Sequence, residues 1–152
     1  MASKDYAVVF DVYRPIKKCH KKLLGELQKR IDLWSANSCI ADVILEWLPN
    51  LSVYEKFASN HGRAKAILEE YWKKEDFQHL VKGLRYGDYR GKRGLNSFTS
   101  GGLPVQRLTR YVLMLRSILN YTPGDHPDFA SVTKAIALAE EKIISINELM
   151  KE

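Results

Sequence analysis

Residues 103–121 read LPVQRLTRYVLMLRSILNY, and this stretch decides the fold. Its apolar residues recur every three or four positions, which is the spacing that places them along one side of an α-helix. Gln106 and Arg110 stand outside this apolar stripe, so burial gives no reason for either of them. The stripe itself consists of Val105, Leu108, Val112, Leu115 and Leu119.

The polar side of this helix has a composition that suits a protein partner. At about 100° per residue, four residues fall within about 60° of one another, facing away from the stripe. They are Gln106, Arg110, Leu113 and Ser117. Protein interfaces favour arginine and a central apolar contact. Since single exposed leucines are common on soluble proteins, an ordinary solvated face is the alternative.

Helical spacing extends through almost the whole chain, whereas strand-like alternation is nearly absent. The predicted helices cover residues 15–34, 40–47, 51–57, 64–84, 103–121 and 129–150. The first of them should bury Ile16, Leu23, Leu27, Ile31 and Trp34. The fold class is therefore all-α.

Three polar residues stand where helix caps are expected. Asn37 and Ser38 precede the helix at 40–47, and Asp125 precedes the last helix. Side chains of these types accept hydrogen bonds from the free backbone N–H groups of a first helical turn. We therefore expect each of them to cap the helix that follows it.

Asn147 stands out in the last predicted helix. It lies at the edge of that helix's apolar stripe, next to Ile146 and one turn after Ile143. We expect it to be half-buried, so its amide needs hydrogen-bond partners. Those partners belong either to the fold itself or to a molecule that docks there.

Residues 83–102, GLRYGDYRGKRGLNSFTSGG, hold six of the nine glycines and predict a flexible loop. From Lys82 to Gly102 five basic residues face Asp88 alone, so the segment contributes +4 to the formal charge of +6. The five are Lys82, Arg85, Arg90, Lys92 and Arg93. Alternating arginine, glycine and tyrosine is typical of segments that stack on RNA, and a positive loop also suits anionic lipid. A plain solvated loop is the other interpretation.

A chain of 152 residues with 45% hydrophobic and 28% charged residues has the size and composition of one globular domain. No apolar run approaches the roughly 20 residues that span a bilayer, and the first ten residues lack the features of a secretory signal. We therefore expect a cytoplasmic protein. Cys19 and Cys39 lack the close pairing of zinc or redox motifs, so we expect free thiols.

Ordinary enzymatic chemistry finds no support in the sequence. The four histidines are scattered, and none pairs with a cysteine or carboxylate at ligand spacing. The glycine-rich segment lacks the order of glycines and lysine that cradles phosphate. We therefore expect neither a metal nor a cofactor. His126, in the turn TPGDHPDF, is expected to be a structural hydrogen-bonding residue.

The stretch LPVQRLTRYVLMLRSILNYTPGDHPDF resembles the third conserved region of the Dbl homology domain, the helical catalytic domain of Rho-family guanine nucleotide exchange factors. The matching features are Pro-Val-Gln-Arg, the following Arg-Tyr, the leucine-rich run and the turn Thr-Pro-x-Asp-His-Pro-Asp. Weaker matches are IADVILEW, VYEKFASN, the closing IISINE, and Phe10, Ile16, His20 and Leu24. The resemblance implies an elongated helical bundle. It also implies a single domain over residues 1–152, without the pleckstrin-homology domain that normally follows.

The resemblance also implies a site and a partner. Gln106 and Arg110 match positions that face the switch regions of a Rho, Rac or Cdc42-type GTPase, and Asn147 matches a residue that contacts switch II. We group Arg107 and Leu113 with these three. The implied activity is release of GDP from the GTPase, without covalent chemistry. The alternative is a Dbl-like scaffold with weak or no exchange activity.

One part of the family pattern has no match in the sequence. Complete domains begin with a helix whose glutamate holds switch I, but the only acids before Glu26 are Asp5 and Asp11. We expect Phe10 to open the family's second helix, so that the first is missing. Another alignment makes VVFDVYRPI the end of the first helix, with a deletion after Pro15. A missing helix would uncover apolar surface, which self-association or a partner helix would cover.

Overall fold

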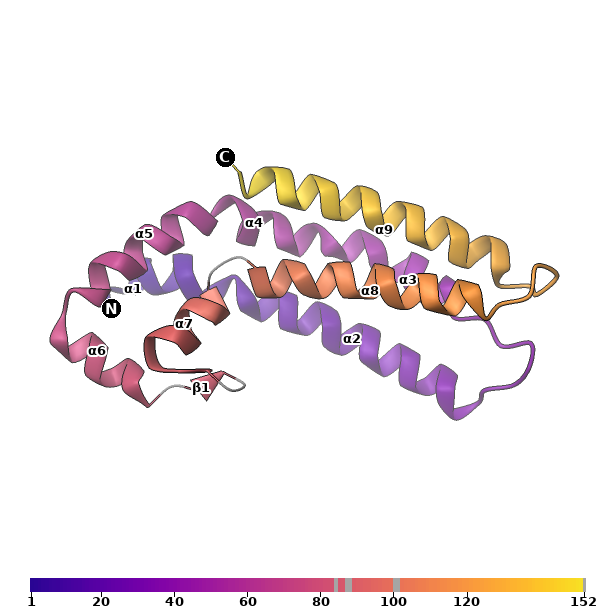
Figure 1. The fold of residues 1–152 in the computed structure, drawn as a ribbon, viewed down its shortest axis with the longest axis horizontal. Helices are drawn as coiled ribbons and strands as arrows, with labels where there is room; N and C mark the ends of the chain where they lie inside the picture. The colour runs from indigo at the N-terminus through magenta and orange to yellow at the C-terminus, as the bar shows by residue number, and fades with distance from the viewer. Residues whose placement is uncertain (84, 87–88, 100–101, 152) are drawn as a thin grey trace.

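The computed structural model is an elongated bundle of helices, which confirms the all-α class (Figure 1). It describes residues 1–83, 85–86, 89–99 and 102–151, with side chains for residues 1–83, 91–95 and 104–151. The N-terminal elements are α1 (Ser3–Tyr6), the π-helix η1 (Ala7–Asp11), α2 (Tyr13–Asp32), α3 (Ala41–Trp47), the 3-10 helix η2 (Leu48–Ser52) and α4 (Val53–Ser59). They are followed by α5 (His61–Trp72), α6 (Glu75–Lys82), β1 (Arg85–Tyr86), β2 (Tyr89–Arg90), α7 (Gly91–Thr99), α8 (Gly102–Asn120) and α9 (Phe129–Leu149).

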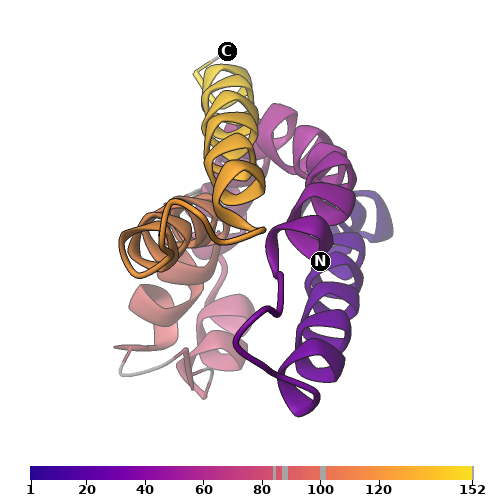
Figure 2. The same cartoon turned by 90° about the vertical axis from the view of Figure 1, so that its right-hand side faces the viewer.

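The body of the bundle has a layered order. α3, η2 and α4 pack against α2 on one side and against α9 on the other. They therefore form a layer between α2 and α9 (Figure 2). α8 lies along α9, and it is the pairing of these two helices that positions the candidate site. Among the described residues, no helix combines the length and apolarity that would let it cross a membrane.

The main core is formed where α2, the middle layer, α8 and α9 meet. The apolar stripe of α8 packs inward as expected, with four of its five residues buried and Leu119 half-buried. Trp47 and Tyr54 contribute the large side chains of the middle layer. Each buried aliphatic side chain contributes about 1.5–3 kcal/mol through the hydrophobic effect. Buried members include Ile16, Cys19, Leu23, Leu108, Val112, Leu115, Val132, Ile136, Ile143 and Ile146.

The buried side of α2 is shorter than the sequence predicts. Ile16 and Leu23 are buried, but Ile31 is 54% exposed and Trp34 is 53% exposed. The helix ends at Asp32, and its C-terminal part diverges from the bundle (Figure 1). Apolar spacing continues past the point where a neighbouring helix is available to cover it, so the expectation for these two residues was wrong.

α2 also distinguishes between the two alignments. It runs without a break from Tyr13 to Asp32, and Pro15 lies in its first turn, where no backbone N–H is required. The alignment that ends a helix at VVFDVYRPI needs an interruption near Pro15. The unbroken helix instead supports the alignment in which Phe10 opens the family's second helix, since η1 leads through the helical Val12 directly into α2.

The described part of residues 83–102 contains regular structure, in the segment where the sequence predicts a flexible loop. β1 and β2 pair antiparallel, and α7 follows with Leu95 buried against α6. Gly91 has a φ of 57°, in the left-handed region that favours glycine, where the chain turns from β2 into α7. Glycines therefore mark a turn between elements here. The second core cluster consists of Val9, Leu68, Phe77, Val81 and Leu95.

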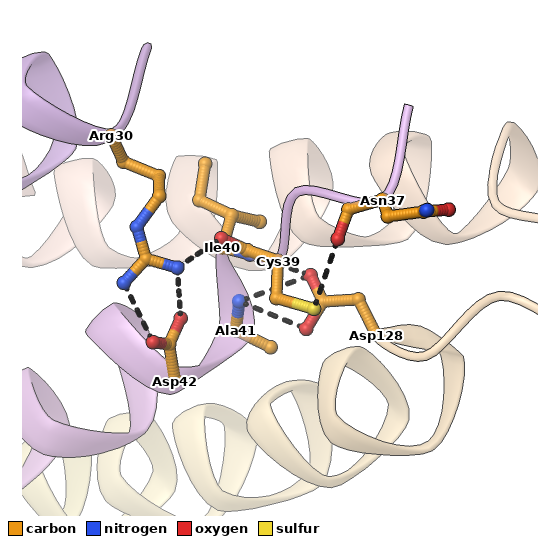
Figure 3. A network of polar contacts seen from close by, with 7 residues as sticks. All are labelled: Arg30, Asn37, Cys39, Ile40, Ala41, Asp42 and Asp128. Atoms are coloured by element: carbon orange, nitrogen blue, oxygen red, sulfur yellow. Dashed lines mark hydrogen bonds and ion pairs between the residues drawn. The ribbon is translucent and has the colours of Figure 1, made fainter. Parts of the chain in front are cut away.

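α3 is capped from the far end of the sequence. The Asp128 carboxylate, only 4% exposed, accepts hydrogen bonds from the N–H groups of Ile40 (2.7 Å) and Ala41 (3.2 Å), as Figure 3 shows. Asn37 and Ser38 do not cap α3, and α9 has no side-chain cap from Asp125. The cap predictions were wrong because sequence proximity does not reveal an acceptor from a distant part of the chain.

His126 reinforces the same junction, as expected for a structural turn residue. Its Nε2 lies 3.0 Å from the carbonyl oxygen of Ala36, and its Nδ1 accepts a hydrogen bond from the N–H of Asp128. Nearby, Arg30 forms an ion pair with Asp42 at 2.7 Å (Figure 3). Together these contacts fix the turn before α9 against the start of α3.

Candidate functional site: a strip along α8 and α9

The candidate site is built on the antiparallel pair of α8 and α9 (Figure 1). An ion pair between the helices sets their register, with Arg116 Nη2 2.5 Å from Glu140 Oε1. Both side chains are substantially exposed, so this pair contributes little stability. Its value here is that it marks which residues of the two helices lie side by side.

The register brings Asn147 level with Arg110. Asn147 lies seven residues after Glu140 on α9, and Arg110 lies six residues before Arg116 on α8. Because the two helices are antiparallel, a step forward along α9 and a step backward along α8 lead in the same direction in space. Each of these two steps is about 10 Å long. Seven residues are also nearly two full turns, so Asn147 shares the α8-facing edge of α9 with Glu140.

The residues that the sequence predicted for this surface are exposed. Gln106, Arg110 and Asn147 are all exposed, and Leu113 is 61% exposed. The expectation of a half-buried Asn147 was wrong, because the contact edge of α9 stops at Ile143 and Ile146. Within the described part of the chain, neither Arg110 nor Asn147 forms a side-chain hydrogen bond or ion pair.

Ile144 is a member of this surface that the sequence prediction missed. It is 60% exposed and lies one turn after Glu140, on the same edge of α9. The register places it near the level of Leu113. A signal was available, since Ile144 falls about 100° away from the buried Ile143. We call the set the α8–α9 strip: Gln106, Arg110, Leu113, Ile144 and Asn147.

Arg107 belongs to a different side of α8. Its Nε donates a hydrogen bond to the Tyr111 hydroxyl at 3.1 Å, and its guanidinium lies 5.7 Å from the centre of the Tyr111 ring. By rotation Arg107 lies about 100° from Gln106 and about 60° from Arg110, and its contact with Tyr111 directs its side chain away from the strip. The structure therefore does not bring Arg107 together with the strip.

Tyr111 connects α8 to the core through His20 of α2. The Tyr111 hydroxyl lies 3.0 Å from His20 Nδ1, and the Tyr54 hydroxyl lies 2.7 Å from His20 Nε2. The two rings of His20 and Tyr111 stack at 5.5 Å. A neutral imidazole donates from one nitrogen and accepts at the other, so it can satisfy both contacts. This cluster anchors the inner side of α8 and so orients its outer side.

Burial keeps this imidazole neutral. The pKa of His20 is lowered to about 4, chiefly because burial disfavours the charged ring and secondly because Arg107 is near. Burial likewise raises the pKa of the Tyr54 hydroxyl. Both groups therefore serve as hydrogen-bonding residues of the core near neutral pH.

The predicted basic residues around the hairpin form a separate group. Arg85 and Arg90 face each other as backbone partners in the two strands, and their side chains lie outside the described residues. The Lys92 ammonium lies 5.0 Å from the centre of the Trp72 ring, and Arg93 also has a partner within the fold. Part of this basic segment is therefore engaged in holding α7 in place.

The thiols and acids offer no further site chemistry. Both cysteines are free, as expected, and Cys19 is buried, which raises the pKa of its thiol. Among the described residues, no three His, Cys, Asp or Glu side chains gather in a way that could hold a metal ion.

The chain is similar to known proteins over almost its whole length. The chain is 30% identical over 156 residues to intersectin-1 of Homo sapiens, which covers 100% of this chain and 9% of that protein. It is 28% identical over 147 residues to Rho guanine nucleotide exchange factor 3 of Gallus gallus, covering 97% of this chain and 28% of that protein. The chain thus spans less than a third of these curated relatives.

Solved structures share the fold. The DH domain of FARP2 matches with a TM-score of 0.77 and 22% identity, over 99% of this chain and 74% of that one. The PDZ-RhoGEF DH/PH domains, solved in complex with GTP-gamma-S activated RhoA, match with a TM-score of 0.79 and 20% identity. That match covers 100% of this chain and 44% of the other. The model of the RhoGEF domain matches residues 1–147, nearly the whole chain, and the chain therefore belongs to the RhoGEF domain family.

Proposed function

We propose that this protein binds a Rho-family small GTPase through the α8–α9 strip and promotes release of its GDP. The proposal depends on one observation: the α8–α9 strip exposes two amides, a guanidinium and two apolar side chains at matching levels of two neighbouring helices. Membership of the RhoGEF domain family supports it. The fold it shares with PDZ-RhoGEF, a protein solved with RhoA, supports it further.

Each part of the strip has a distinct role in this proposal. Leu113 and Ile144 form the apolar centre, which loses water when a partner docks. The Arg110 guanidinium pairs with a carboxylate or a backbone carbonyl of the GTPase. Gln106 and Asn147 both donate and accept hydrogen bonds, so they suit the backbone of a mobile switch segment.

The proposed catalysis is a matter of differential binding. A protein that binds the nucleotide-free GTPase more tightly than the loaded form must weaken nucleotide binding by the same factor. Each 1.4 kcal/mol of this coupling corresponds to about one factor of ten. Several contacts of the strip must therefore act together to give a useful acceleration.

A fluorescent-GDP release assay tests the proposal. We expect the full chain to accelerate release from at least one of a panel of Rho, Rac and Cdc42-type proteins, and to bind that GTPase best without nucleotide. Ras-type GTPases serve as the negative control. Absence of both acceleration and binding across the panel would exclude the proposed function.

The second candidate is a scaffold that binds a GTPase without accelerating release. This candidate is suggested by the two acidic residues before Glu26, Asp5 and Asp11. Neither of them matches the glutamate of the family's first conserved region. The same assay separates the two functions. A scaffold binds loaded and nucleotide-free GTPase with similar affinity and leaves the release rate unchanged.

Two further partners stay predictions. If RNA or lipid binds the basic segment around β1 and β2, binding should be sensitive to salt and lost when residues 90–93 are deleted.

Self-association, or a partner helix, is suggested by the exposed Leu24 and Ile31 of α2 and Met114 of α8. Light scattering on the eluate of a sizing column tests it, since a monomer at high concentration would contradict self-association.

A further inference from the structure

The outer face of α2 carries a dense group of positive charges. Five basic residues lie within nine positions, and no acidic residue occurs from Val12 to Gly25. At about 100° per residue they occupy an arc of about 140°, opposite the buried Ile16 and Leu23. Along the axis they span about 12 Å. We call this set the α2 basic face: Arg14, Lys17, Lys18, Lys21 and Lys22.

The lysines of this face are exposed, and Lys22 also interacts electrostatically with Glu26, whose carboxylate pairs with Lys29. All four are exposed, and within the described part of the chain none forms an ion pair. Arg14 alone has a partner, with its Nε 3.6 Å from the Asp11 carboxylate. Like charges held this close repel one another, so the face is favourable only for an anionic partner.

The layered order of the bundle turns this face away from α9. The buried side of α2 packs on α3, η2 and α4, and those elements pack on α9 beyond them. The opposite side of α2 is therefore an outer surface of the molecule on the far side from α9 (Figure 2). A partner on the α2 basic face leaves α9 and its side of the strip open.

A hollow with an apolar lining adjoins the charges. It has a volume of about 330 Å³ between α2 and η2, and Lys18 and Lys22 lie on its rim. The apolar part of its lining comes from Pro15, Cys19 and Val53. Positive charge and apolar groups thus lie side by side on this surface.

We propose that the α2 basic face docks on an anionic lipid bilayer. The helix presents its charges over one broad outer side, about 12 Å long, which suits a planar surface bearing many single negative charges. The lysines are separate point charges without the planar fork of arginine, so they suit diffuse surface charge rather than one phosphorylated headgroup. The adjoining apolar hollow suits the interface between headgroups and acyl chains.

A nucleic acid fits this face less well. Binding of single strands relies on aromatic side chains that stack on bases, and the basic face contains none. A nucleic acid also offers no apolar group for the hollow beside Lys18 and Lys22. The observations therefore favour a membrane surface.

Co-sedimentation of the full chain with vesicles tests the proposal. One set of vesicles is phosphatidylcholine alone, and the other contains about 30% phosphatidylserine. The variant Lys17→Gln, Lys18→Gln, Lys21→Gln, Lys22→Gln is compared with a matched control, Lys56→Gln, Lys65→Gln, Lys134→Gln, Lys151→Gln. The control replaces four exposed lysines elsewhere, so both variants lose the same charge.

We expect binding to the anionic vesicles only, with each α2 lysine contributing about fivefold to partitioning. The α2 variant should lose about a hundredfold or more, and the control less than fivefold. Replacement of the same four residues by arginine should preserve binding. Vesicles with phosphatidylglycerol in place of phosphatidylserine should bind the protein equally well at equal surface charge, because the α2 basic face interacts with the negative charge and not with a particular headgroup.

Three results would overturn the proposal. Equal losses in both variants would mean that only net charge matters. A loss confined to Lys92→Gln, Arg93→Gln would assign binding to the hairpin segment. Binding to single-stranded RNA without binding to vesicles would assign another partner. GTPase binding in solution should be unchanged in the α2 variant, so failure here leaves the proposed function intact.

Discussion

Asp128 caps a helix that begins 88 residues earlier in the chain, since its carboxylate accepts a hydrogen bond from the N–H of Ile40 at 2.7 Å. The aspartate itself lies at the start of α9 and does not cap its own helix. One buried carboxylate thereby fixes the start of α9 to the start of α3. Since α9 carries two of the five residues of the strip, this contact helps to set the strip's geometry.

Replacing Asp128 by alanine should destabilise the fold. The change leaves two N–H groups of α3 without their partner, which typically costs about 1–2 kcal/mol. Urea unfolding followed by circular dichroism measures this. Asp125→Ala is the matched control, because Asp125 is exposed, and it should change stability by less than about 0.5 kcal/mol. Equal effects would refute the capping role.

His20 should make stability depend on pH. Its folded pKa of about 4 lies below the ordinary value of 6.5, so the unfolded chain takes up the proton more readily. Its contribution is fully present above about pH 6.5 and is lost as pH falls toward 4. Because the ring is only partly buried, we expect a loss of about 1.5 kcal/mol, roughly half the full linkage value.

Unfolding by urea at pH 7 and pH 5 measures the part of that loss that falls between these two values, about 1 kcal/mol. His20→Gln keeps a polar side chain but cannot titrate, so its stability should change less between the two pH values. His79→Gln, at an exposed position, should keep the wild-type difference. An unaltered pH dependence in His20→Gln would show that another group is responsible.

Leu113 and Ile144 should act as the apolar centre of the GTPase interface. We expect Leu113→Ala and Ile144→Ala each to weaken GTPase binding about tenfold, as buried central contacts commonly do. Leu24→Ala is the matched control, since Leu24 is 65% exposed and Leu113 61%. Titration calorimetry with nucleotide-free GTPase gives the affinities. If Leu24→Ala weakens binding as much, the interface lies elsewhere.

The sequence predicted what depends on helical periodicity. The stripe of α8 and the exposure of Gln106, Arg110 and Leu113 follow from spacing alone, because a residue's angular position on a helix is fixed by its number. The resemblance located Gln106 and Arg110 independently. The register with α9 was not predictable, since it depends on how the apolar sides of α8 and α9 pack together, and spacing within one helix does not reveal this.

The errors arise where structure depends on distant parts of the chain. Trp34 was expected inside because its spacing fits, yet spacing does not tell where the covering helix ends. α7 was missed because glycines in a short segment suggest a loop, while Leu95 is buried by contact with α6. The α3 cap was missed because Asp128 lies far away in sequence.

The most direct test of the central claim is the affinity of Arg110→Glu for a nucleotide-free Rho-family GTPase. Arg110 is exposed and unpaired in the described structure, so reversing its charge should change the free energy of unfolding by less than about 0.5 kcal/mol. Binding should nevertheless be abolished, while Arg63→Glu, on exposed α5, binds like the wild type. A folded Arg110→Glu protein that binds the GTPase with wild-type affinity would contradict the account.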